Sequence, residues 1–233
     1  IVLVAVVVRR ARAASAPLRP GRAGLVAAAR AGSWLLVRTL SLRIALVVTV
    51  VVATSLGTAE LAATHIWFAL YALLALALDA LAIAGQALIG RGLGAADVPR
   101  VHAITRRLVG WGLVVGLALT GVLLASIPLL QVAMTSDASV RDALPLAVAI
   151  LALGLPLAGV VFVLDGVLIG AGDGRYLALT GVLNLGAYAA VLPLVGSLDL
   201  LLGAFTLVYL GARALTLGAR ARGARWIVTG ATI

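Results

Sequence analysis

The sequence contains no cysteine and no lysine, and it has only two histidines. Without cysteine the chain can form neither a disulfide framework nor a reactive thiol, and a Cys/His metal site is also excluded. Without lysine the chain lacks the Walker lysine on which P-loop nucleotide hydrolysis depends. These absences remove several large classes of enzyme and of metal-stabilised fold.

Charge of any kind is scarce, because only 11% of the residues are charged whereas 64% are hydrophobic, and the mean hydropathy is +1.21. Such a composition indicates an integral membrane protein. Long apolar runs favour helices over a barrel, whose strands would alternate polar and apolar residues. The net charge of +10 comes from eighteen arginines that lack the interleaved aromatics of a nucleic-acid groove, so no nucleic-acid partner is expected.

The hydropathy pattern predicts an all-α integral membrane fold with a lobe of six transmembrane helices at residues 34–218. Residues 1–8 are expected to end a preceding membrane helix, residues 9–33 to form a cytoplasmic connector with one short surface helix, and residues 219–233 to form a cytoplasmic tail. Seventeen of the eighteen arginines then fall on one side of the membrane, which places the C-terminus in the cytoplasm. The six expected spans are residues 34–56, 61–90, 108–130, 144–170, 176–195 and 200–217.

Two aspartates are expected near the middle of the membrane. Asp79 lies twelve residues before Arg91, or ~18 Å along a helix, and Asp165 lies ten residues before Arg175, or ~15 Å. An ionised side chain at that depth costs ~3 kcal/mol on insertion scales, so both acids are candidates for function. Each can instead form a structural hydrogen bond with a neighbouring helix.

Polar residues on the same helices extend these candidate sites. Gln86 falls on the face of Asp79, and Thr180, Asn184 and Tyr188 follow one another at intervals of four residues. Contact with a ligand and hydrogen bonding between helices both remain open for this second set. Arg43 is expected either to extend to the lipid headgroups or to pair with a buried acid.

A mid-membrane acid can bind and release a proton or sodium ion, or hold a cationic substrate. Acid–base catalysis by the two aspartates is not excluded by their spacing, but no nucleophile, metal set or cofactor loop supports it. His65 and His102 fall at opposite membrane faces, so a serine–histidine pair inside the bilayer is not expected either. The chain is therefore not expected to be an enzyme.

Two long motifs carry a family resemblance: LDALAIAGQALIGRGLG at residues 78–94 and PLAGVVFVLDGVLIGAGD at residues 156–173. They resemble the multidrug and toxic compound extrusion (MATE) transporters, specifically their bacterial DinF-like branch. Two shorter segments support the resemblance less strongly, namely RTLSLRIAL at residues 38–46 and TSD at residues 135–137. The order and spacing of the motifs are similar to the C-terminal half of that family, the last six of twelve helices.

The resemblance implies a V-shaped transporter of two six-helix lobes in the bacterial cytoplasmic (inner) membrane, which exchanges protons or sodium for amphipathic or cationic compounds. By motif position Asp165 is similar to the helix-ten carboxylate implicated in cation coupling, and Asp79 falls in helix eight. Sodium-coupled members place a glutamate in helix seven, which this chain lacks, so a proton is favoured. The implied partners are membrane lipid, small substrates and the N-terminal six-helix lobe, and no cofactor is expected beyond the coupling H+ or Na+.

Two alternatives to a multidrug antiporter remain. The wider superfamily includes flippases for lipid-linked saccharide precursors, and basic residues in the central cavity would favour that function because they can hold a pyrophosphate. A non-transporting membrane scaffold or permease subunit is the other alternative. It predicts that neutralising both aspartates leaves function intact.

Overall fold

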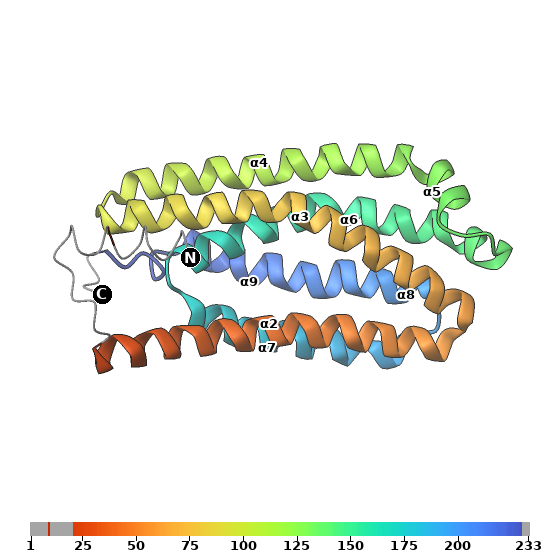
Figure 1. Ribbon diagram of the computed structural model, residues 1–233, viewed down its shortest axis with the longest axis horizontal. Coiled ribbons are helices and arrows are strands. Elements are labelled where there is room, and N and C mark those ends of the chain that lie inside the picture. Colours follow the sequence, from red (N-terminus) through yellow and green to blue (C-terminus); the bar gives the residue numbers. More distant parts are fainter. Residues whose placement is uncertain (1–8, 10–20, 230–233) are drawn as a thin grey trace.

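The computed structural model describes residue 9 and residues 21–229, and nearly all of these are helical (Figure 1). The expected helix end at residues 1–8 and residues 10–20 of the expected connector lie outside the described residues. In chain order the elements are α2 (Arg22–Leu56), α3 (Thr58–Gly94), α4 (Val98–Ala125), α5 (Ile127–Ala133), α6 (Ala138–Gly170), α7 (Gly174–Val191), the 3-10 turn η1 (Leu192–Leu194), α8 (Leu198–Gly203), the π-helical segment η2 (Ala204–Tyr209) and α9 (Leu210–Arg222).

Six helices within the described part of the chain are long and apolar enough to cross a membrane, which confirms the predicted all-α lobe. The segments α8, η2 and α9 together form the sixth of them. Short connections join neighbouring spans. At Gly57, between α2 and α3, φ is 149°, a value that favours glycine. Asp137 begins α6 by accepting hydrogen bonds from the backbone N–H groups of Ser139 and Val140.

Several boundaries differ from the sequence prediction, because α4 begins at Val98, α6 begins at Ala138 and α9 ends at Arg222. Residues 22–33, expected as a connector with a short surface helix, are instead the first turns of α2. The alanine-rich stretch here contains no proline, so nothing interrupts the helix. The expected third span of residues 108–130 ends at Ala125, because Pro128 lies in the first turn of the separate short helix α5, which begins at Ile127.

Helix α6 occupies the centre of the lobe and packs against both α3 and α4, while α2 lies alongside α7 (Figure 1). The backbones of α4 and α6 come very close together. A Cβ atom at Gly112 of α4 would lie only 2.6 Å from the carbonyl oxygen of Gly159 of α6. Such close approach through glycine is common between membrane helices, where dispersion contacts replace the hydrophobic effect as the driving force.

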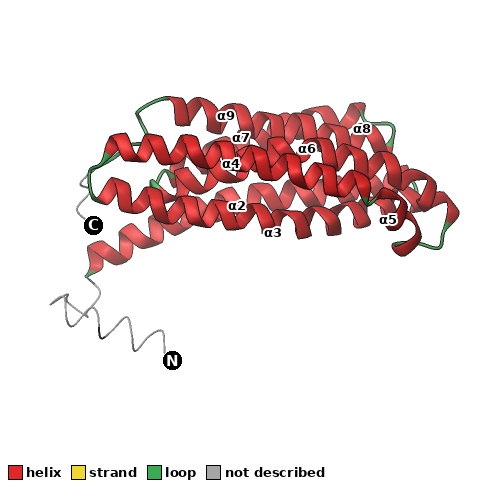
Figure 2. Cartoon of the chain, turned by 90° about the horizontal axis from the view of Figure 1, so that it is seen from above, coloured by secondary structure: helices red, strands yellow, loops and turns green. Residues whose placement is uncertain are grey.

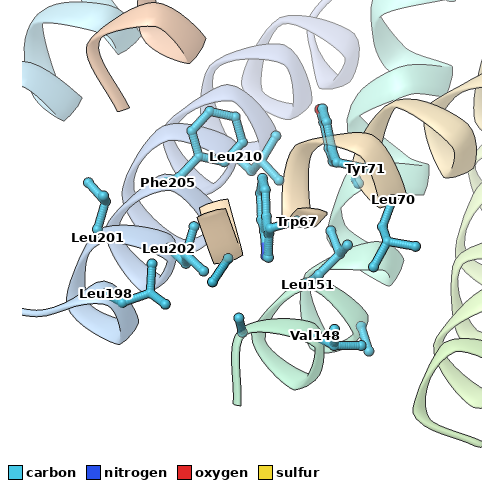
Figure 3. Close-up of a cluster of buried hydrophobic side chains, with 14 of the residues drawn as sticks. Trp67, Leu70, Tyr71, Val148, Leu151, Leu198, Leu201, Leu202, Phe205 and Leu210 are labelled. Atoms are coloured by element: carbon cyan, nitrogen blue, oxygen red, sulfur yellow. The ribbon is translucent and has the colours of Figure 1, made fainter. Parts of the chain in front are cut away.

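Aromatic side chains pack together in the core between α3 and η2 (Figure 3). The ring of Trp67 stacks on Tyr71 at a centroid distance of 5.5 Å, and it meets the edge of Phe205 at the same distance. Phe205 also contacts Tyr209, with ring centroids 5.3 Å apart. These rings fix η2 against α3, immediately before the part of α9 that carries Arg213.

Candidate functional site

The candidate site is centred on Asp165 of α6, whose exposed fraction is 5%. Two arginines from other helices contact its carboxylate. Arg38 of α2 forms an ion pair with Oδ2, and Nη2 of Arg213 of α9 lies 3.1 Å from Oδ1. The Asp165 cluster, which we define as these three residues, therefore links α2, α6 and α9.

The Asp165 cluster carries one more positive than negative charge. Its hydrogen bonding is also incomplete, since Oδ1 of Asp165 and Nε of Arg38 have no hydrogen-bond partner among the described residues. Taking charges out of water is costly, and two guanidinium groups sharing one carboxylate compensate that cost only partly. A buried cluster with surplus charge contributes little to the stability of the fold, so its presence is better explained by a function.

Little free space remains around the cluster. The enclosed volume bordered by the cluster, Thr180, Asn184 and Tyr209 is about 10 Å³, which is room for about one water molecule. The Arg213 guanidinium carbon lies 6.0 Å from the centre of the Tyr209 ring, within range of a cation–π interaction.

The three polar residues predicted to share a face of α7 differ in their contacts, some of which belong to the site and some of which join helices. Thr180 and Asn184 border the cluster, but the Thr180 hydroxyl donates to the carbonyl of Tyr176 in its own helix. Asn184 Nδ2 donates to Oγ1 of Thr216 on α9 at 3.2 Å. Tyr188 shares a 2.7 Å hydrogen bond with Thr49 of α2. The interpretation as hydrogen bonding between helices therefore holds for Asn184 and Tyr188.

Asp79 and Gln86 do not join the cluster. Both side chains are exposed on the surface of this lobe, so Asp79 does not share the buried environment of Asp165. The buried face of α3 includes Leu78, Gly85 and Ile89, and the neighbouring positions of Asp79 and Gln86 turn away from that face. Their functional role stays a prediction.

The sequence interpretation missed both arginines of the site. Arg43, expected to reach the headgroups or pair with an acid, is exposed on α2, and Arg38 pairs with Asp165 instead. Arg213 was counted among the cytoplasmic arginines but is buried, because α9 continues nine residues, or ~13 Å, beyond it. Among the described residues no three His, Cys, Asp or Glu side chains are grouped so as to hold a metal ion.

Comparison with known proteins identifies relatives by sequence. Residues 35–196 match the MatE family. Protein DETOXIFICATION 43 of Arabidopsis thaliana is 30% identical over 151 residues, which cover 65% of this chain and 29% of that protein. Protein DETOXIFICATION 42 of the same plant is 28% identical over 152 residues, which cover 65% of this chain and 30% of that protein. The chain thus spans less than a third of these plant relatives, which give no support to the narrower bacterial DinF-like assignment.

Solved structures agree on the fold. A multidrug resistance MATE family transporter of the MOP superfamily, in an outward-facing conformation, superimposes with a TM-score of 0.78 at 18% identity, over 88% of this chain and 47% of the other. A MOP superfamily transporter from Pyrococcus furiosus gives a TM-score of 0.73 at 20% identity, over 84% of this chain and 43% of the other. This chain covers less than half of each larger structure. The chain therefore belongs to the MatE family, whose members are transporters, and it has the fold of one lobe of a MATE transporter.

Proposed function

We propose that this chain is the C-terminal lobe of a cation-coupled antiporter that exports amphipathic or cationic compounds across the bacterial cytoplasmic membrane. Asp165 is the coupling carboxylate, and a proton is the favoured coupling ion. The observation that carries this proposal is the burial of Asp165 between arginines from two other helices. The N-terminal six-helix lobe completes the transporter.

In this arrangement, protonation of Asp165 would change how α2 and α9 pack against α6. Ionised Asp165 attracts both guanidinium groups and so holds α2 and α9 against α6. When Asp165 binds a proton, that attraction is lost and the two arginines repel each other in a poorly solvated space. A ligand shifts a conformational equilibrium by as much as its affinities for the two states differ. Proton binding would thus stabilise a second packing of α2 and α9.

The same geometry favours a proton over sodium. Surplus positive charge opposes a proton and a sodium ion alike, because each carries one positive charge. A sodium ion also needs several oxygen ligands, whereas both carboxylate oxygens of Asp165 already face a guanidinium group. A proton needs only one free lone pair, and Oδ1 accepts no hydrogen bond from the described residues. The enclosed space of about 10 Å³ also leaves no room for a hydrated cation.

Asp79 is the proposed substrate carboxylate. It is exposed on α3, on the same lobe as the Asp165 cluster. A cationic compound bound at Asp79 would compete with Arg38 for negative charge. Release of Arg38 from a protonated Asp165 would strengthen that competition, so proton entry would favour release of the substrate.

Ethidium efflux from cells that express the full-length protein tests the proposal. Asp165→Asn alone leaves two arginines unpaired and is expected to fold poorly, so the double variant Asp165→Asn/Arg213→Gln is compared as well. We expect the double variant to reach the membrane normally but to lose efflux driven by a pH gradient. Asp142→Asn on the same helix is the matched control, because Asp142 is exposed and far along the chain from the cluster. Normal pH-driven efflux by the double variant would contradict the proposal.

The surplus positive charge also favours a second candidate, a flippase for an anionic lipid-linked saccharide precursor. Arg38 and Arg213 are the basic residues that such a function would need near the centre of the lobe. For the Pyrococcus furiosus relative, reverse polarity of the binding pocket is described as suggesting a different function. If the wild-type protein exports no cationic dye but moves a diphosphate lipid, and Arg38→Gln abolishes that movement, the flippase replaces the antiporter.

A further inference from the structure

A cleft of about 870 Å³ lies at the end of the lobe where α2 begins, and none of its lining residues belongs to the Asp165 cluster. The first turns of α2 form one wall. Gln86 of α3, Ile169 of α6 and the turn that leads to Arg175 form the others. Figure 2 shows the start of α2 projecting beyond the rest of the bundle. We call this space the arginine cleft.

The wall formed by α2 has a regular pattern. Arg22, Val26, Arg30 and Trp34 all line the cleft and follow one another at intervals of four residues, so they share one face of the helix. Arg22 and Arg30 are ~12 Å apart along the axis, and Trp34 lies one turn further. Trp34 packs beside Gly174 at the start of α7, next to Arg175. Along this face of α2, arginines thus alternate with apolar side chains.

The charges of the cleft are unbalanced. Arg22, Arg30 and Arg175 are all exposed, and no carboxylate lines the cleft with them. None of the three forms an ion pair with any residue in the described part of the chain. The rest of the lining is mainly apolar and includes Leu35 and Ile169. A ligand that fits must carry negative charge at one end and hydrocarbon at the other.

We propose that the arginine cleft binds an acidic phospholipid of the surrounding bilayer. Arg22, Arg30 and Arg175 hold its phosphate, and an acyl chain follows the apolar wall toward Leu35. Basic pockets between membrane helices are a known way to bind acidic headgroups, and Trp34 is suited to the level where headgroup meets hydrocarbon. A bound lipid would tie the projecting turns of α2 to the start of α7, a role separate from cation coupling at Asp165.

Quenching of Trp34 fluorescence by brominated lipids tests the proposal on the full-length protein. The protein is reconstituted in phosphatidylcholine vesicles that contain a minor fraction of brominated phosphatidylglycerol or of brominated phosphatidylcholine. The signal of Trp34 is obtained as the difference between the wild type and Trp34→Phe, which leaves the other tryptophans in place. We expect brominated phosphatidylglycerol to quench Trp34 much more strongly than the same fraction of brominated phosphatidylcholine.

The decisive variant is Arg22→Gln/Arg30→Gln/Arg175→Gln. At roughly fivefold per basic residue near the membrane surface, it should lose the preference for phosphatidylglycerol by roughly a hundredfold. The matched control replaces three exposed arginines that do not line the cleft, namely Arg106, Arg107 and Arg222, and it should keep the preference. Equal quenching by the two lipids, no quenching by either, or equal losses in the two triple variants would overturn the proposal.

Discussion

Replacing Asp165 with asparagine should destabilise the protein far more than replacing Arg213 with glutamine. The Asp165 cluster has two guanidinium groups and one carboxylate, so its net charge is +1. Asp165→Asn raises that charge to +2 in a buried space, whereas Arg213→Gln lowers it to zero and leaves the Arg38 ion pair in place. Removing one partner of a buried pair costs about 3–5 kcal/mol. The side chain of Arg38 is 22% exposed and can partly reach solvent, so we expect about 3 kcal/mol for Asp165→Asn.

The cost of Arg213→Gln should be near 1 kcal/mol, because the lost contact at 3.1 Å is not a well-formed hydrogen bond. The double variant Asp165→Asn/Arg213→Gln should be more stable than Asp165→Asn alone, since it removes one of the two unpaired arginines. Thermal unfolding of the purified full-length protein, followed by circular dichroism, measures all three. For a full-length protein about twice the size of this chain, at about 1–2 °C per kcal/mol, Asp165→Asn should lower Tm by about 3–6 °C.

Asp142→Asn, on an exposed site of the same helix, should change the free energy of unfolding by less than about 0.5 kcal/mol. An equal decrease in Tm for Arg213→Gln and Asp165→Asn would contradict this charge balance. Simple addition of the two single costs in the double variant would contradict it too, because the arginines would then not depend on the carboxylate.

Three further outcomes are expected from the packing and hydrogen bonds of the lobe. Gly112→Ala should cost about 1–3 kcal/mol through its clash with α6, whereas Gly110→Ala, with open space around it, should be neutral or stabilising in the same unfolding assay. Tyr188→Phe should cost about 1 kcal/mol, since it removes only the hydrogen bond with Thr49. Hydrogen bonds, of which the one from the Ser139 side chain has the largest effect, hold the pKa of Asp137 below its usual value. The contribution of Asp137 to stability should therefore be present at neutral pH and lost as the pH falls below about 4. Asp137→Asn should weaken this pH dependence when Tm is measured across an acid titration.

Asp165 could be found from the sequence because an acid stands out in a long apolar run. Its depth in the membrane stays a prediction, made from the distance to the next arginine. The number of spans was equally accessible, since length and hydropathy alone define a membrane helix. The acid in an apolar run and the number of spans can each be predicted from the sequence of a single helix.

The partners of Asp165 depend on how segments face one another, which hydropathy does not encode. Helix α2 is apolar on most of its circumference, so its sequence does not show that Arg38 rather than Arg43 faces α6. The same ambiguity explains Asp79, which turns away from the buried face of α3 although it is as deep in its helix as expected. Arg213 was missed for another reason: an arginine near the end of an apolar run looks like a membrane-boundary marker until the true end of α9 is known.

The π-helical segment η2 has a consequence for how relatives of this protein should be aligned. A π-helical turn holds one residue more than the α-helical turn it replaces. Loss of one residue within Ala204–Tyr209 could therefore be absorbed by a return to α-helix, with Arg213 still opposite Asp165. Loss of one residue between Leu210 and Arg213 would instead rotate the arginine by ~100° about the helix axis. Homologues can thus differ by one residue ahead of Leu210 and still build the same ion cluster.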